Sequence, residues 1–139
     1  MEMFVSHDPT VNSVGTITSP LHALNFVKQY HDTPDNGLVS ILRLNARKEV
    51  IGVTHNKTDM DSAWEVATVH DAVNEKGCVG IIVLYDKQSG NLPATGKEVE
   101  TFDSLHRKLA AVQLNLIDVL AVGKGRFYSY ADERVTWTD

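Results

Sequence analysis

The sequence predicts a three-layer α/β domain, in which a mixed β-sheet lies between layers of helices. Apolar runs of strand length alternate along the chain with segments whose apolar residues recur every three or four positions. Helices that alternate in this way with strands and hairpins favour a layered domain with a mixed sheet. A chain of 139 residues is long enough to bury its own core. We therefore expect one domain over residues 1–139, with its core at about 17–132 and terminal extensions at 1–16 and 133–139.

The first half of the chain predicts a strand, a helix and a hairpin. Residues 3–5 suggest a short first strand. Ser19 is a good helix cap and Pro20 suits the first helical position. The apolar face of that helix is predicted to carry Leu21, Leu24 and Val27, before the turn-forming segment at 31–37 ends the helix. Strands are predicted at 38–44 and 49–54, and the short polar turn between them makes a hairpin.

A second helix and a central strand follow. Several capping residues at 58–62 precede a helix that ends at Gly77. Its inner face is predicted from three- and four-residue spacing as Ala63, Val66, Ala67, His70 and Val73. The run at 79–85 is short and apolar throughout, which indicates a strand covered on both faces.

The last part predicts a third helix and a second hairpin. Thr95 and Glu98 have the spacing of a capping box at the helix start. The inner face is predicted to carry Val99, Phe102, Leu105 or His106, Leu109 and Val112. Strands are expected at 116–122 and 126–130. The tail after residue 130 is mostly polar, and no strand is predicted there.

Composition and charge exclude several classes of function. Hydrophobic residues make up 42% of the chain and charged residues 22%, as in a soluble globular protein. The net charge of −5 argues against a nucleic-acid binder that works through bulk charge. No apolar run reaches the length of a membrane span and the N-terminus lacks a signal peptide, so we expect a cytoplasmic protein without a membrane partner. The single cysteine, Cys78, excludes an internal disulfide and is expected to be a buried, inert thiol.

Several segments in order resemble one known family. The segment from Ile81 to Val99 resembles the core of the RadC-like JAB/MPN (JAMM) domains, which have an apolar strand, then His-Asn-His-Pro-Ser-Gly, a proline-containing loop, and Ser-x-x-Asp at a helix start. The segments at 41–52, 64–66, 116–123 and 127–131 resemble further pieces of the same family. The resemblance covers about residues 17–132 and implies the JAB/MPN, cytidine-deaminase-like architecture.

The resemblance also implies a zinc hydrolase site, but this chain departs from the motif. In the family, two histidines and an aspartate hold zinc, a glutamate is the general base and a serine steadies the oxyanion. The two histidine positions are Tyr85 and Lys87 here. The aspartate position is Glu98 and the serine position is Thr95, while the base position falls at about Gly37. A lysine at a metal-ligand position opposes cation binding, so no cofactor is expected.

Two interpretations of these positions follow. The one we favour is structural: Lys87 and Glu98 form a salt bridge in place of the metal, and Thr95 with Glu98 caps the helix. The other is a cleft that binds a ligand or partner. The candidate binding residues at the former metal cleft are Tyr85, Asp86, Lys87, Ser89, Thr95 and Glu98.

The leading functional hypothesis is a catalytically inactive domain, a pseudoenzyme, that binds a protein and inhibits or regulates it. Because RadC-like genes are often carried by phages and mobile elements, the resemblance also raises an anti-defence role. The alternative is a divergent metal-dependent hydrolase, acting as an isopeptidase, peptidase or nuclease, with zinc ligands drawn from Glu98, Asp86 and His7 or His55. A nucleic-acid-associated protein is the second alternative, without support from charge. A homo-oligomer is left open.

Overall fold

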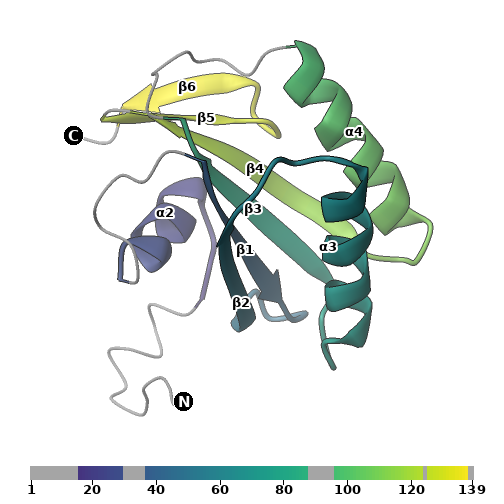
Figure 1. The fold of residues 1–139 in the computed structure, drawn as a ribbon. Helices are drawn as coiled ribbons and strands as arrows, with labels where there is room; N and C mark the ends of the chain where they lie inside the picture. Colours follow the sequence, from purple (N-terminus) through teal and green to yellow (C-terminus); the bar gives the residue numbers. More distant parts are fainter. Residues whose placement is uncertain (1–15, 30–36, 88–95, 124, 138–139) are drawn as a thin grey trace.

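The computed structural model describes residues 16–29, 37–123 without 88–95, and 125–137, and it contains a mixed sheet with helices on both faces (Figure 1). The described elements are α2 (Pro20–Lys28), β1 (Leu38–Leu44), β2 (Val50–Lys57), α3 (Ser62–Asn74), β3 (Gly80–Asp86), α4 (Gly96–Ala110), β4 (Asn115–Gly123), β5 (Arg126–Ser129) and β6 (Arg134–Trp137).

The strands form one six-stranded sheet in the order β2-β1-β3-β4-β5-β6. β3 runs parallel to β4, and every other neighbouring pair is antiparallel. The parallel pair needs a crossover, which α4 supplies between β3 and β4. The sheet is therefore mixed, as the sequence predicts.

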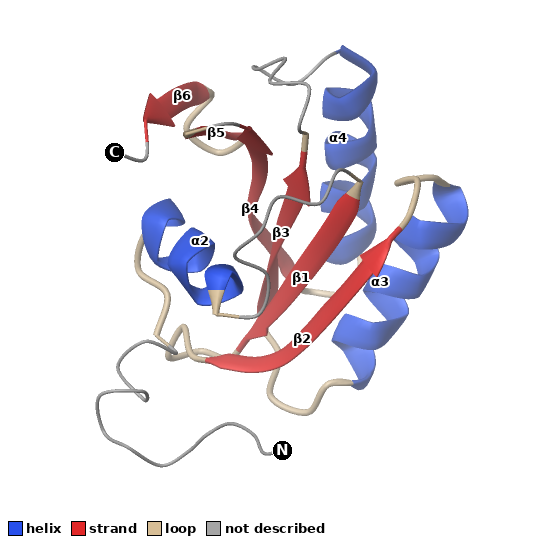
Figure 2. Ribbon diagram, turned by 60° about the vertical axis from the view of Figure 1, so that its left-hand side comes forward, coloured by secondary structure: helices blue, strands red, loops and turns tan. Residues whose placement is uncertain are grey.

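Two cores lie on opposite faces of this sheet. α2 covers one face, where Leu24 packs with Leu42 and Leu84 of the strands. α3 and α4 cover the other face, where Phe102 packs with Val83 and Tyr85. Figure 2 shows α2 on one side of the strands and α3 and α4 on the other. The three predicted layers are confirmed, and β3 is buried on both faces as expected.

The predicted start of α2 is confirmed, whereas part of its predicted apolar face is not. The Ser19 hydroxyl accepts the His22 backbone N–H at 3.2 Å, and Pro20 is the first helical residue. Leu21 is 44% exposed. The buried residues are Ala23, Leu24, Phe26 and Val27. The two additional apolar positions, Ala23 and Phe26, turn the helix away from Leu21.

The predicted inner face of α3 is wrong. Val66 and Val73 are 60% and 54% exposed, and the His70 side chain is 74% exposed. The buried residues are Trp64, Glu65, Thr68 and Ala72. Burial of the large Trp64 indole decides the orientation, because an aromatic side chain removes more apolar area from water than a valine does. Asp61 caps the helix by accepting the Trp64 N–H at 2.9 Å.

In α4 the buried residues are Phe102, Leu105 and Leu109, so the predicted apolar face is largely confirmed. His106 and Val112 are exposed instead of lying in the core. Of the two residues predicted as alternatives for the inner face, Leu105 is the buried one. Burying Leu105 avoids the cost of removing the His106 imidazole from water.

Differences also occur at the ends of predicted strands. β2 extends to Lys57, three residues beyond its predicted end, because it pairs with β1 along its whole length. The sequence predicts no strand at β6. It nevertheless pairs antiparallel with β5, with Arg126 opposite Trp137 at one end and Ser129 opposite Arg134 at the other. The predicted strand at residues 3–5 lies outside the described residues. None of the helices in the described part of the chain is long and apolar enough to cross a membrane.

Cys78 is half-buried and precedes β3. Its thiol donates to the Gly80 carbonyl at 3.4 Å, and burial raises its pKa. Since the thiolate is the reactive form, this environment agrees with the expected inert thiol.

Candidate functional site

The candidate site lies where β3 ends against the start of α4. Tyr85 and Lys87 are two residues apart and therefore project from the same face of the sheet. Tyr85 pairs with Val39 of β1 and with Ala121 of β4. The Lys87 N–H donates to the Val122 carbonyl at 2.8 Å, which keeps Lys87 in register beside β4 just after the strand ends.

Glu98, in the first turn of α4, accepts two hydrogen bonds from this strand. Its Oε1 accepts the Tyr85 hydroxyl at 3.1 Å and the Lys87 ammonium at 2.9 Å. The Lys87 side chain is 11% exposed and that of Glu98 is 24% exposed. The predicted Lys87–Glu98 salt bridge is thus present. It is largely shielded from water and ties β3 to α4.

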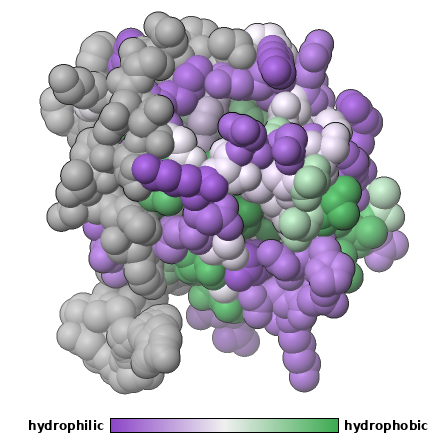
Figure 3. Space-filling model, viewed as in Figure 1, coloured by the Kyte–Doolittle hydropathy of each residue, from purple (hydrophilic) through white to green (hydrophobic). Residues whose placement is uncertain are grey.

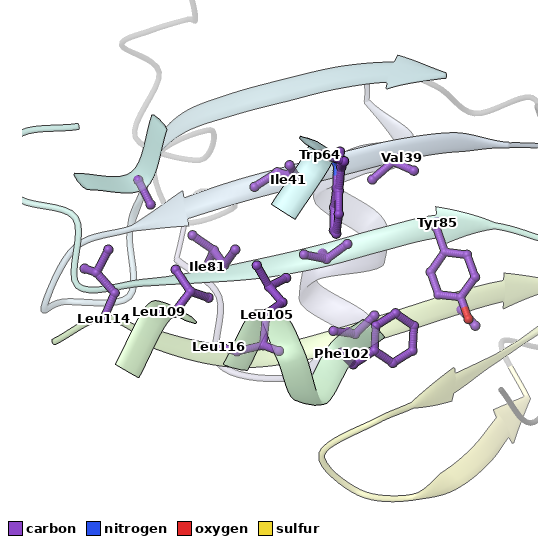
Figure 4. Packing of buried hydrophobic residues seen from close by; sticks show 14 of the residues in the cluster. Val39, Ile41, Trp64, Ile81, Tyr85, Phe102, Leu105, Leu109, Leu114 and Leu116 are labelled. Carbon is purple, nitrogen blue, oxygen red and sulfur yellow. The ribbon is translucent and has the colours of Figure 1, made fainter. Parts of the chain in front are cut away.

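Aromatic rings extend the site along α4. Phe102 lies one turn after Glu98 and packs between two tyrosines, with ring centroids 5.6 Å from Tyr85 and 5.6 Å from Tyr130. Figure 4 shows Tyr85 and Phe102 side by side at this end of the core. The Tyr130 hydroxyl donates to Asp103 Oδ1 and anchors the chain after β5 to the same helix. These contacts fix the position of Tyr85 from both sides.

The two tyrosines that touch α4 are held in the neutral form. Burial raises the pKa of Tyr85 far above its usual range, and the adjacent Glu98 carboxylate raises it further. The hydrogen bond to Asp103 and burial raise the pKa of Tyr130 to about 12. Both hydroxyls therefore act as hydrogen-bond donors at neutral pH.

The position assigned to the general base also reaches this edge. The Gly37 N–H donates to the Asp86 carbonyl at 3.1 Å, so the chain before β1 lies beside the end of β3. Gly37 has a φ of +87°, and a Cβ placed there would meet no atom within 4 Å. A glycine supplies no base at this position.

The remaining predicted residues are not gathered here. Asp86 projects from the opposite face of β3 to Tyr85. Ser89, Thr95 and His7 lie outside the described residues. His55 pairs across the sheet with Ser40, whose hydroxyl is 2.8 Å from His55 Nδ1, and this pair lies on the α2 face. Within the described ranges, no three His, Cys, Asp or Glu side chains form a group that could hold a metal.

Zinc does not fit the donors present at the family's positions. A Lys87 ammonium occupies one ligand position and donates to the Glu98 carboxylate that would occupy another. Tyr85 presents a phenol whose pKa is raised, so it offers no phenolate. Zinc sites in proteins use thiolate, imidazole and carboxylate ligands. Of these, only the carboxylate is present, and it is already paired with a cation.

Two further acidic groups shape this region, and the sequence pattern assigns neither of them to the candidate site. Asp118 is buried and accepts the Ser129 hydroxyl at 2.7 Å, the Val119 N–H at 2.8 Å and the Ala131 N–H at 3.0 Å. It therefore anchors the chain after β5. The second is Asp103, the partner of Tyr130; it lies one residue after Phe102, and no local pattern marks it out.

A partly buried polar cluster also joins α3 to α4. Glu65 Oε1 accepts the Ser104 hydroxyl at 2.6 Å and the Lys108 ammonium at 2.7 Å. Ser104 and Lys108 are four residues apart on one side of α4, which suits a shared partner. This cluster is satisfied internally, so it holds the helices together and offers no open site.

Comparison with known proteins identifies the family. No curated protein matches the chain. The model of the RadC-like JAB domain family matches residues 17–135, from the segment before α2 into β6. The match covers the sheet, the helices and the candidate site. The chain therefore belongs to the RadC-like JAB domain family, within a superfamily of metallohydrolases.

Proposed function

We propose that this chain is a catalytically inactive RadC-like JAB domain that acts by binding, and thereby inhibiting or regulating, another protein. The observation that carries the proposal is the shielded contact of Lys87 with Glu98, 2.9 Å apart at positions where the family has metal ligands. A fixed ammonium group repels a divalent cation, and the contact leaves the carboxylate already neutralised. The glycine at the base position removes a second element of the chemistry.

The proposal is also supported by what the site retains. Tyr85, Lys87 and Glu98 hold β3 and α4 together through side chains alone. The domain can thus keep its shape at this edge without a metal, and a shape that persists without a cofactor is what a binding module needs. The proposed partner is another protein. If the gene is carried by a phage or mobile element, the candidate partners are host defence proteins.

Metal content is the first test. Untagged protein, purified without chelator and loaded with zinc, is expected to retain far less than one zinc per chain after desalting. The matched variant Y85H/K87H/E98D restores the family's ligands at three positions and is expected to gain zinc binding by calorimetry. About one zinc per wild-type chain, lost in E98Q, would refute the proposal and favour the hydrolase alternative, with H55A testing a rebuilt site.

A binding test follows from the same residues. Affinity purification from the source cell is run with the wild type and with K87A and Y85F as bait. If all three baits retain a partner at the same level, Tyr85 and Lys87 do not contribute to its binding, and the binding surface lies elsewhere. Failure to recover any specific partner, together with peptidase activity of the zinc-loaded chain, would contradict the binding role.

A further inference from the structure

α2 covers only part of its face of the sheet. This helix of nine residues is about 14 Å long, whereas the nine residues of β4 extend over about 30 Å. Figure 2 shows the short helix against the longer strands. Beside the start of α2, a cavity of about 390 Å³ lies over the first halves of β3 and β4. We call it the α2-side cavity. Its volume lies within the roughly 300–1,000 Å³ that is usual for small-molecule sites.

The cavity has an apolar floor and an apolar mouth. Leu44, Ile82 and Leu120 line it and are each at most 3% exposed, so they form its floor. Val79 and Ile117 also line it and are 38% and 40% exposed, so they lie nearer its mouth. Figure 3 shows the side of the molecule where Figure 1 draws α3 and α4, and there hydrophilic residues surround scattered apolar ones. Exposed apolar residues that gather around a hollow are typical of a ligand site.

A β-bulge aims two neighbouring side chains at this cavity. Ile81 of β3 lies opposite Leu116, but the next residue of β3 lies opposite Asp118. Ile117 is therefore an extra residue of β4. Leu116 packs in the core beneath α4, whereas Ile117 and Asp118 both line the cavity. Bulges redirect side chains and are rare in parallel strand pairs. One local irregularity thus supplies both an apolar and an acidic part of the cavity wall.

Asp118 brings a poorly compensated charge to that wall. It is 6% exposed, and its carboxylate accepts the Ser129 hydroxyl and the N–H groups of Val119 and Ala131. These donors are all neutral, and they occupy three of the roughly four acceptor positions of a carboxylate. The nearby charge that acts on Asp118 is a second carboxylate, Asp132, which also lines the cavity. A buried carboxylate that is held only by neutral donors attracts a cation.

A lysine lies on the opposite wall of the cavity. Lys48 is in the turn between β1 and β2, and it is exposed. β3 separates β1 from β4, so the walls that carry Lys48 and Asp118 are two strand spacings, or roughly 10 Å, apart. Solvent and salt screen an exposed ammonium group at such a distance. The wall formed by β4 therefore stays acidic, while the rim beside the hairpin is basic.

We propose that the α2-side cavity binds a small alkylamine, whose ammonium group donates to Asp118 while its hydrocarbon chain lies on Leu44 and Leu120. The ammonium group supplies a counter-charge and uses the remaining acceptor position. The hydrocarbon chain removes the apolar floor from water. An anion would be repelled by the two carboxylates of the wall, and an alcohol would leave their charge uncompensated. This inference does not depend on the proposed function, because the cavity lies on the opposite face of the sheet from the side chain of Tyr85.

An NMR titration tests the charge of the ligand with three probes of similar length. Hexylamine carries a cation, 1-hexanol carries no charge and hexanoate carries an anion. Amide chemical shifts of the ¹⁵N-labelled protein are followed near neutral pH. We expect hexylamine to bind with a Kd of about 1 mM. The other two probes should bind at least about tenfold more weakly, because a hydrogen bond between charged groups is stronger than one to a neutral group.

A fourth probe distinguishes a free amine from a lysine side chain of another protein. Nα-acetyllysine methylamide carries the same ammonium group, but its two amides would lie at the apolar mouth of the cavity. It should therefore bind at least about fivefold more weakly than hexylamine. Equal binding would assign the cavity to a lysine side chain and overturn the proposal of a free amine.

Two variants test the place of binding. Ala46 is an exposed residue of the cavity wall, so A46W should fill the cavity without disturbing the core and weaken hexylamine binding at least about tenfold. A111W makes the same change at an exposed alanine just after α4 and should bind like the wild type. D118N should bind hexylamine and hexanol equally. E65Q, which neutralises a buried carboxylate on the opposite face of the sheet, should keep the preference for the amine.

The outcomes that would overturn the proposal are specific. They are no binding of hexylamine at about 50 mM, equal affinities of the three hexyl probes, unchanged hexylamine binding in A46W, and a preference for the amine that persists in D118N. Circular dichroism checks that each variant is folded. A46W keeps the hydrogen bonds of Asp118, so the place of binding is still tested if D118N does not fold.

Discussion

Replacing Lys87 with methionine should destabilise the domain by about 2 kcal/mol. The Nζ–Oε1 distance of 2.9 Å corresponds to a gross attraction of about 6 kcal/mol at an effective dielectric constant of about 20. Desolvation offsets most of this attraction. Exposed pairs contribute about 0–1 kcal/mol, whereas breaking a buried pair costs about 3–5 kcal/mol. With exposures of 11% and 24%, and with Tyr85 still donating to Glu98 in the variant, an intermediate value follows.

Urea unfolding followed by circular dichroism measures this loss. With an m value of about 2 kcal/mol/M for a chain of this size, the midpoint of K87M should fall by about 1 M. A double-mutant cycle with E98M isolates the pair, because Tyr85 loses its acceptor equally in E98M and in the double variant. The coupling energy should be about 2 kcal/mol.

The control is K108M, which breaks another ion pair on α4. Lys108 is 40% exposed, but the Glu65 carboxylate that K108M leaves behind is only 8% exposed and keeps only the Ser104 hydroxyl, so K108M should cost at least as much as K87M. A Lys87–Glu98 coupling below about 0.5 kcal/mol would refute the reasoning, because the pair would then behave as a solvated surface contact.

Three further predictions follow from the same contacts. G52A should lower the free energy of unfolding by about 1 kcal/mol, because its Cβ would lie 2.1 Å from Glu75 Oε1 and 2.7 Å from Arg43 Nε and would force the ends of this ion pair to move. G96A, with open space around its Cβ, is the control, and equal urea midpoints would contradict this. Burial raises the pKa of Asp118 above its ordinary value near 3.8, so the folded state binds this proton more tightly than the unfolded chain and stability falls as pH rises above about 4. Urea unfolding at pH 4 to 7 should show a smaller loss of stability with rising pH in the isosteric variant D118N than in the wild type. Parallel stability–pH profiles of the two proteins would exclude the effect. D103N should lower the pKa of Tyr130 from about 12 in an ultraviolet titration, since an amide stabilises the neutral phenol less than a carboxylate does; an unchanged titration would rule out the contact.

Much of the fold could be predicted from the sequence because the central strands β1 and β3 are buried along almost their whole length. β3 is apolar up to Asp86, and only Ser40 and Arg43 interrupt the apolar run of β1, so the positions of both strands follow from composition. The cap of α2 is equally local, since Ser19 and Pro20 act on the adjacent turn. The Lys87–Glu98 pair could be predicted because the resemblance places both residues at one site.

The orientation of α3 could not be predicted, because periodicity allows two solutions for a helix with two apolar faces. The deciding contacts are distant in sequence: Glu65 lies 39 residues from Ser104 and 43 from Lys108. Without those partners a buried glutamate is costly, so local reasoning places it outside. β6 was missed for a similar reason, since its strand character comes from pairing with β5 and not from its own polar sequence.

The place of β6 has a consequence for shortened forms of the chain. A chain that ended at residue 132 would lose the strand that pairs with residues 126–129. β5 would then present unpaired N–H and C=O groups along its outer side, and Tyr128 would lose its cross-strand neighbour Val135. Such an edge is a template for pairing with the same edge of another molecule. Termination just before β6 is therefore expected to yield aggregates, even though Tyr85, Lys87 and Glu98 would still be present.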